Sequence, residues 1–438
     1  MRGSVLRVLA KCSSRFSQPT ARGRNRKRRR RPFVVIEASC GAAQPLSKDM
    51  ESTQPVLGGA VTSRDFVSIQ ILRALAALMV VVWHSHLSVK HFVHSYLPTD
   101  DREFLRLHCP SVFNHLYFGV DIFFCISGFI MTMLVVRGGE DRPGVFILRR
   151  VTRIFPMYWL FSLIVLAVCM INPRFSVAGF SGNAAADFKH AIFSLLLLPE
   201  GQAPMLGVGW TLVQEMGFYF SIFVLLLLNG GRFVVAWIAL IASVMLIAGL
   251  GAAPARADGF ISVFYPEFMF GALAYKFHPY VSGRWAALQL SLAVLFYALL
   301  SAASDFWPIP EISEIRIVGC GLVGFLLICG SIGMEPRLNR SFARFFKAIG
   351  DSSYVLYLSH WLVLSFLGKI GAALFPGLGA VGVAGWHVAS ISAAVGVGYA
   401  IHRLVEKPLN LRLRKWLEHT RASSLFGRGA RAFLPAER

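Results

Sequence analysis

The chain has 438 residues, of which 55% are hydrophobic and only 15% are charged, and its formal net charge is +21. A soluble globular protein carries about a quarter of charged residues, so this composition excludes an ordinary soluble protein. Apolar runs of about 20 residues, the length that spans a bilayer, recur from residue 68 to residue 402. The sequence therefore predicts an all-α polytopic integral membrane protein.

Ten apolar runs predict transmembrane helices near 68–87, 116–136, 154–171, 207–228, 232–251, 258–277, 284–303, 315–333, 352–374 and 379–402. A shorter run at 188–198 is either an eleventh helix or a helix at the membrane interface. If the N-terminus is cytoplasmic, Lys and Arg are concentrated in the loops on the inner side, as the positive-inside rule requires. We therefore expect both termini in the cytoplasm and an even number of helices.

Three segments divide the chain. Residues 1–63 form a basic tail that includes RGRNRKRRRR at 22–31, and residues 1–49 alone supply +11 of the net charge. Such a run can bind nucleic acid or anionic lipid. We interpret it instead as a disordered tail, or as untranslated sequence upstream of Met50, and expect no nucleic-acid partner. A transmembrane domain at 64–408 and a basic cytoplasmic tail at 409–438 follow.

The first predicted helix carries two ionisable residues within an apolar run, LRALAALMVVVWHSH at 72–86. Arg73 and His84 are eleven positions apart, which is three helical turns to within about 20°, so they share one face about 16 Å apart. Charged residues at membrane depth are costly and usually face a cavity or the bundle interior, which favours a functional role. The alternative is that Arg73 reaches the inner headgroups and His84 lies at the outer interface.

Other ionisable residues lie at predicted membrane depth in later helices. Asp121 opens the second helix, Glu215 lies about two turns into the fourth, and His360 lies near the middle of the ninth. Arg150 and Arg153 lie at the cytoplasmic mouth of the third. Arginines on that side suit a phosphate-bearing donor. A histidine at the depth of two acids on the outer side suits general-base activation of an acceptor.

The sequence gives little support for a metal site. Its seven cysteines form no CxxC pair, so neither a disulfide framework nor a zinc site is indicated. His91 and His94 have a spacing that metal sites use, but no thiolate or paired acid completes the set. We therefore interpret them as solvated loop histidines and expect no bound metal.

Six motifs follow one another between Phe66 and Pro408. They are Arg73 with His84, GVDIFFCISGF at 119–129, Arg150 with Arg153, Trp210 to Glu215, Ser353 to His360, and Glu406-Lys407-Pro408. In this order they resemble the membrane acyltransferase-3 family, whose members O-acylate bacterial cell-surface glycans. Within that family, the opening FVSIQILRALAALMVVVWH is most similar to the rhizobial exopolysaccharide O-acetyltransferases.

The resemblance implies a multi-pass protein of the bacterial inner membrane that takes an acyl group from cytoplasmic acyl-CoA, with acetyl-CoA as the expected donor. The acceptor would be a hydroxyl of an exopolysaccharide, another cell-surface glycan or a lipid-linked precursor. His84 would act as general base or transient acyl carrier, and Arg73 would hold the donor or polarise its thioester. Arg150 and Arg153 would bind the CoA phosphates.

The remaining candidates have less specific roles. Glu215 or Asp121 would orient the imidazole or contact sugar hydroxyls, and Tyr354 and Trp210 are possible additional site residues. His360 would either take part in the chemistry or simply form an interhelical hydrogen bond. The alternative function is a glycan transporter or a non-catalytic subunit of an export machine. Use of an acyl donor distinguishes an acyltransferase from this alternative, because only the enzyme must bind acyl-CoA and leave esters on a glycan.

Overall fold

The computed structural model describes residues 66–93, 111–137, 142–171, 180–229, 262–306, 314–374 and 379–422. These residues form helices, and no strand occurs among them. The helices are α1 (Val67–Val93), η1 (Ser111–Phe118), α3 (Gly119–Val136), α4 (Pro143–Ile171), α5 (Ala184–Leu195), η2 (Gly207–Gly209), α6 (Trp210–Asn229), α8 (Tyr265–Phe277), η3 (His278–Tyr280), α9 (Gly283–Phe306), α10 (Glu314–Met334), η4 (Glu335–Arg337), α11 (Arg340–Asp351), α12 (Ser353–Leu374), α13 (Ala380–Ile401), the π-helix η5 (His402–Glu406) and α14 (Lys407–Ala422).

Eight helical segments within the described residues are long and apolar enough to cross a membrane. They correspond to eight of the ten predicted helices, which confirms an all-helical membrane protein. The predicted helix at 232–251 lies outside the described residues. The run at 258–277 contains the 13-residue α8, and the run at 188–198 overlaps the 12-residue α5. Helices of this length reach only about 20 Å, less than the roughly 30 Å of a bilayer core.

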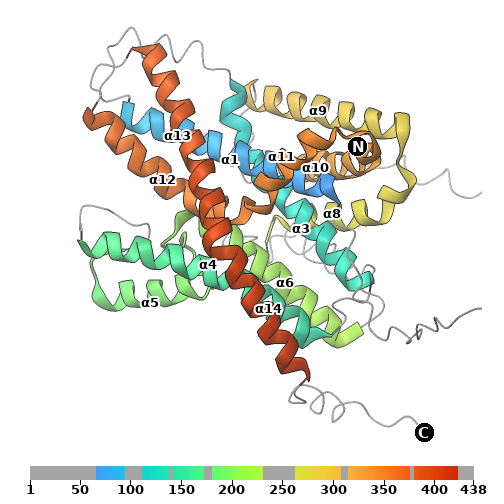
Figure 1. Ribbon diagram of the computed structural model, residues 1–438, viewed down its shortest axis with the longest axis horizontal. Coiled ribbons are helices and arrows are strands. Elements are labelled where there is room, and N and C mark those ends of the chain that lie inside the picture. The colour runs from blue at the N-terminus through green and yellow to red at the C-terminus, as the bar shows by residue number, and fades with distance from the viewer. Residues whose placement is uncertain are drawn as a thin grey trace, which may run out of the picture. The chain divides into compact units, whose positions relative to one another are not determined.

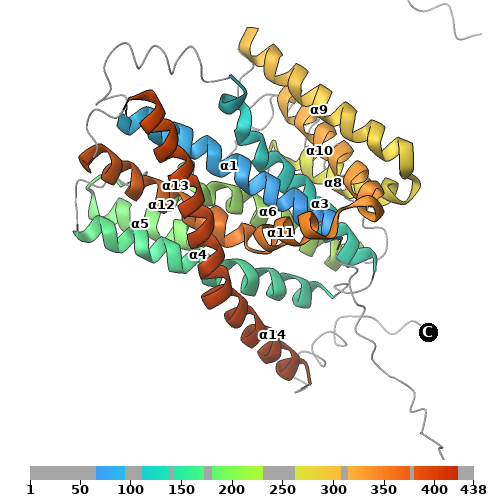
Figure 2. The ribbon, with the colours of Figure 1, turned by 45° about the horizontal axis from the view of Figure 1, so that its top comes forward.

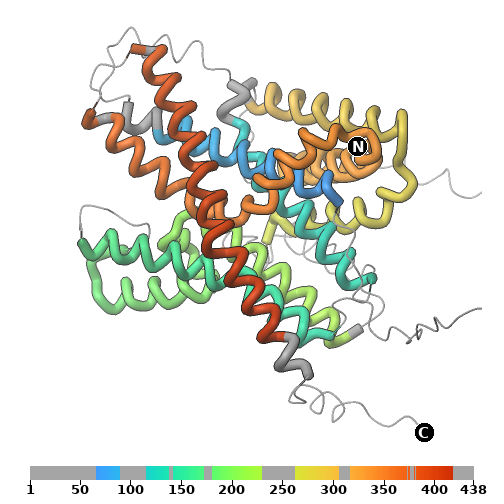
Figure 3. The backbone as a smooth tube through the Cα atoms, in the orientation of Figure 1, coloured from blue at the N-terminus to red at the C-terminus, as the bar shows by residue number. Residues whose placement is uncertain are grey.

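Two helices extend beyond the apolar runs that predicted them. α4 begins at Pro143 rather than near residue 154, because proline suits the first turn of a helix and the arginines that follow remain helical. α13 continues through η5 into α14, and Figure 3 shows these elements as one rod. Its segment from 381 to 417 has 37 residues, about 55 Å of helix. The charged end in α14 therefore extends beyond a bilayer core.

α11 lies between the predicted helices at 315–333 and 352–374, where no helix was predicted. Basic residues interrupt its aromatic ones in RSFARFFKAIGD, so no apolar run marks it. Asn339 caps its first turn by accepting hydrogen bonds from the backbone N–H groups of Ser341 and Phe342, at 2.9 and 3.2 Å. α11 packs against α1, and Gly350 near its end lies against the backbone of Gln70.

α1 and α3 lie in the middle of the bundle (Figures 1 and 2), with α9 at one edge and α5 at the other. α1 contacts α3, α10, α11, α12 and α13, and α3 also contacts α6 and α8. Three alanines of α1, Ala74, Ala76 and Ala77, are almost completely buried, which lets the neighbouring helices come close. The helix that carries Arg73 and His84 therefore contacts five other helices.

α3 and α8 approach each other at two glycines. A Cβ atom at Gly128 would collide with the backbone carbonyl of Phe268, and one at Gly271 would collide with that of Cys125. Small residues allow such close approach of helix backbones in a membrane. This packing fixes the position of α3, the helix that carries Asp121.

We predict that Gly271→Ala lowers the melting temperature of the purified protein in detergent. The added methyl group has no room, and overpacking of this kind costs about 1–3 kcal/mol. Gly396→Ala in α13 is the matched control, because nothing lies within 4 Å of a Cβ atom there. The control gains helix propensity and should melt at the same or a higher temperature. Equal melting temperatures for the two variants would contradict the packing constraint.

Candidate active site

Two cavities open along the face of α1 that carries Arg73 and His84. His84 lines the larger, of about 490 Å³, which we call the His84 cavity. Arg73 lines the smaller, of about 80 Å³, which we call the Arg73 cavity. Val120 and Tyr357 line both. The two cavities therefore meet at this pair of side chains, near the middle of the bundle.

The His84 cavity combines aromatic rings with a few polar side chains. Its rings come from five different elements or loops, and its polar groups include two amides and an ion pair. The rings are Trp83, Tyr117, Trp210, Phe264, Tyr357 and Trp361, and the polar residues are Asp121, Gln202, Gln214 and Arg316. A mostly apolar cavity with a few placed polar groups is typical of a small-molecule site.

His84 lies in an aromatic setting and contacts a second histidine. Its ring packs edge-on against Trp83 and Trp361, with centroids 4.5 and 5.3 Å apart. Its Nδ1 lies 3.0 Å from the carbonyl oxygen of Val80 and 3.2 Å from Nε2 of His360. The packing of α12 on α1 brings the fully buried His360 to this position.

Asp121 shares the His84 cavity but is held by an arginine. Nη2 of Arg316 donates to both carboxylate oxygens of Asp121, at 3.1 and 2.9 Å, and the guanidinium lies 4.6 Å above the ring of Tyr117. Glu267, at the start of α8, is also completely buried. A buried carboxylate needs a partner of this kind to offset its loss of hydration. Asp121 is therefore a wall residue of the cavity rather than a partner of the His84 ring.

The Arg73 cavity is lined by two guanidinium groups and one carboxylate, from Arg73, Arg153 and Glu215. Oε1 of Glu215 accepts a hydrogen bond from Oγ of Ser127 at 2.9 Å and another from the hydroxyl of Tyr219. The lining groups thus carry a net positive charge when ionised. Such a cavity suits an anionic ligand.

Tyr357 is fixed at the junction of the cavities. Its hydroxyl donates to the carbonyl of Val208 at 3.1 Å and accepts from Oγ1 of Thr211 at 2.9 Å. Thr211 follows the short helix η2, so this pair of bonds ties α12 to the start of α6. The junction is therefore a built feature and not a loosely packed gap.

The structure separates the predicted site residues into groups. His84, Asp121 and Trp210 line the His84 cavity, whereas Arg73, Arg153, Glu215 and Tyr354 line the Arg73 cavity. Glu215, expected at the depth of His84, lies instead with Arg73.

Arg150 lines neither cavity. It is buried, with its guanidinium 5.7 Å from the ring centre of Phe146 and 5.9 Å from that of Tyr219. The exposed Arg153, three residues further on, does line the Arg73 cavity. The two arginines predicted to act together are thus directed differently, one into the α4–α6 packing and one towards a cavity.

Some site residues were missed in the sequence. Arg316, Glu267 and the loop at 198–204 received no role, and Tyr357 was noted only as part of a motif. Among the described residues, no three His, Cys, Asp or Glu side chains are grouped to hold a metal ion. The side chains of His91, His94 and His108 and the tail at 1–63 lie outside the described part of the chain.

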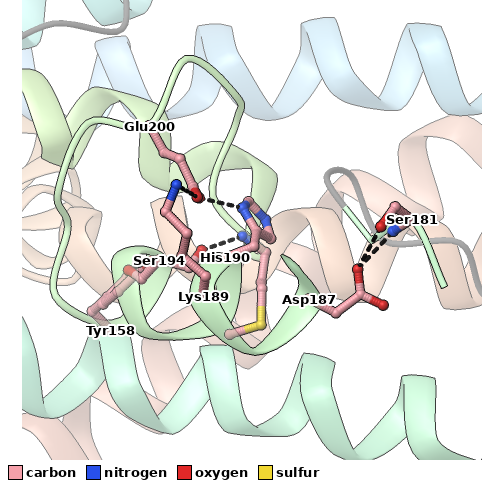
Figure 4. A network of polar contacts seen from close by, with 8 residues as sticks. Tyr158, Ser181, Asp187, Lys189, His190, Ser194 and Glu200 are labelled. Atoms are coloured by element: carbon pink, nitrogen blue, oxygen red, sulfur yellow. Dashed lines mark hydrogen bonds and ion pairs between the residues drawn. The ribbon is translucent and has the colours of Figure 1, made fainter. Parts of the chain in front are cut away.

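An ion-pair network holds the loop that forms one wall of the His84 cavity (Figure 4). Glu200 pairs with Lys189 at 3.3 Å and with Nδ1 of His190 at 2.9 Å, both on α5. Partial burial alone would raise the pKa of Glu200, but its bonds to His190 and Lys189 outweigh this and lower the pKa below its ordinary value. Because the pKa is lowered, the pairing persists at neutral pH and is lost only as the pH falls through the acidic range of that carboxyl.

Residues 66–403 match the family model described as an acyltransferase domain. The chain therefore belongs to the acyltransferase-3 family, and it is a multi-pass membrane protein with an acyltransferase domain across most of its length. This confirms the resemblance that the six motifs predicted. The chain is similar to the exopolysaccharide production protein ExoZ of Rhizobium meliloti (strain 1021), with 28% identity over 328 residues, which cover 71% of this chain and 94% of ExoZ. No solved structure matches the chain.

We predict that Glu200→Gln increases hydrogen–deuterium exchange in the segment 197–206. Loss of an ion pair worth about 1 kcal/mol should reduce protection roughly fivefold. Asp187→Asn is the matched control, because Asp187 is also a carboxylate of α5 but accepts hydrogen bonds from Ser181 and Gly182, which precede that helix. Unchanged exchange in the Glu200 variant would show that the network does not hold the loop.

Proposed function

We propose that this protein transfers an acyl group, with acetyl as the expected one, from cytoplasmic acyl-CoA to a hydroxyl of an exopolysaccharide or of its lipid-linked precursor. The observation that carries the proposal is the pair of cavities that meet at Tyr357 and Val120, one lined by arginines and one by His84. Membership of the acyltransferase family favours an enzyme over a transporter or a subunit of an export machine. The similarity to a protein of exopolysaccharide production supports the class of acceptor.

The arginines favour the Arg73 cavity as the donor side, with both termini and this cavity facing the cytoplasm of a bacterial inner membrane. Arg153 is exposed at the mouth of the cavity and suits a CoA phosphate. Arg73 and His84 are about 16 Å apart along α1, a separation comparable to an extended pantetheine arm. Arg73 therefore holds the donor, and it is too far from His84 to polarise the carbonyl that an acceptor at His84 attacks.

The aromatic walls of the His84 cavity suit the acceptor. Aromatic rings cover the apolar faces of sugars, and Gln202 offers an amide group to a sugar hydroxyl. His84 takes the proton of the hydroxyl as its oxygen attacks the thioester carbonyl. The C–S bond then breaks, the ester leaves with the glycan, and the CoA thiolate recovers the proton as a thiol. The acyl group meets the acceptor by passing between Val120 and Tyr357.

The direct test is the ester content of the surface polysaccharide from a deletion strain complemented with variant genes. Wild-type protein should restore the esters. His84→Ala should lower acylation by about 10²–10⁴-fold, the usual contribution of general acid–base catalysis. His86→Ala is the control, because residue 86 lies about 200° round the helix from His84 and should cause only a small loss. Normal ester levels with inserted His84→Ala protein would contradict the assignment.

A second prediction separates the two arginines of α4. Arg153→Gln should raise the KM for acyl-CoA about tenfold, because a charged hydrogen bond to phosphate contributes about 1.5 kcal/mol or more. Arg150→Gln should instead lower the melting temperature, because it removes a buried cation that lies near two aromatic rings in the α4–α6 packing. Both are measured on purified protein with acyl-CoA as the varied substrate. A donor KM that changes with Arg150 and not with Arg153 would reverse the assignment.

A further inference from the structure

The two histidines at the His84 cavity contact each other through specific nitrogen atoms. Nε2 of His360 lies 3.2 Å from Nδ1 of His84. Each Nδ1 also faces a backbone carbonyl one turn earlier in its own helix, Leu356 for His360 at 3.2 Å and Val80 for His84 at 3.0 Å. A carbonyl oxygen only accepts hydrogen bonds, so these contacts determine where the ring protons lie.

His360 must carry its proton on Nδ1, which donates to the carbonyl of Leu356. A neutral imidazole has one N–H, so Nε2 of His360 is then an acceptor. His360 is fully buried and sits in the packed interface of α12 with α1, so its ring is held in this orientation. The side chain thus offers a lone pair to the neighbouring histidine.

His84 must also carry its proton on Nδ1. That nitrogen faces two acceptors, the carbonyl oxygen of Val80 and Nε2 of His360. Without a proton, the lone pair of Nδ1 would lie against the lone pairs of both acceptors, and no hydrogen bond would form. Nε2 of His84 is therefore unprotonated. Because Nδ1 is turned towards α1 and α12 and the ring lines the His84 cavity, Nε2 is the nitrogen left for a ligand.

We propose that His360 is a positioning residue that holds His84 in the Nδ1–H tautomer, so that Nε2 is the atom that removes the acceptor proton. This rests on the proposed function. His360 takes the place that a carboxylate occupies behind the histidine of a catalytic triad. Asp121 does not supply this group, because Arg316 holds both of its carboxylate oxygens. The neutral partner orients the ring without adding a negative charge beside it.

Kinetics of purified variants provide the first test. His360→Leu removes the acceptor and should lower kcat about tenfold, the effect of losing one hydrogen bond, with the KM values for donor and acceptor unchanged. His360→Gln keeps an acceptor oxygen near the position of Nε2 and should recover most of that loss. His387→Leu is the matched control, because His387 also bonds to α1, through Ser85 at 2.8 Å, but does not line the cavity.

Nitrogen-15 NMR of histidine-labelled wild-type protein provides the second test and needs no active variant. The His84 signals, assigned by their absence from His84→Ala, should show a protonated Nδ1 and an unprotonated Nε2. A protonated Nε2 would overturn the proposal, as would a His360→Gln variant no better than His360→Leu, or a His360→Leu variant as active as wild type. A different result would contradict the proposed function, namely full activity of the His84→Ala variant.

Discussion

The structure depends on the cost of placing ionisable groups inside a membrane bundle. α1 carries Arg73 and His84 on one face and contacts five neighbouring helices. A helix is a rigid spacer, so eleven residues hold the two side chains about 16 Å apart whatever else moves. Everything that faces α1 must then supply either a cavity or a polar partner at those two depths, because an unpaired charge there would be costly.

The partners come from helices far apart in the sequence. α12 supplies His360 for His84 and Tyr357 for the junction, while α10 supplies Arg316 for Asp121 of α3. Glu215 of α6 is hydrogen-bonded by Ser127 and Tyr219. Close packing of α3 and α8 at Gly128 and Gly271 fixes one side of this arrangement. The polar interior is thus divided into two chemically different cavities on one continuous helix face.

Apolar runs predicted most of the membrane helices, because length and hydropathy are properties of one segment. They could not predict α11, because basic residues interrupt its apolar residues in the sequence. They also could not predict the depth of Glu215 in the membrane, because that depends on how α6 packs. Arg150 and Arg153 look equivalent in sequence, yet only the packing of α4 on α6 shows which one is buried beside aromatic rings. Arg316 had a signal, since it begins a predicted helix at the same end of the bundle as Asp121, but pairing them needed the tertiary structure.

We propose that one chain receives the acyl group at the Arg73 cavity and delivers it at the His84 cavity, on opposite sides of the membrane. Purified protein reconstituted into sealed vesicles in one orientation tests this, with radiolabelled acetyl-CoA on one side and an exopolysaccharide fragment on the other. We expect labelled ester when the donor is on the side of the Arg73 cavity and the acceptor is on the side of the His84 cavity. Labelled ester formed only when donor and acceptor share one side would contradict it.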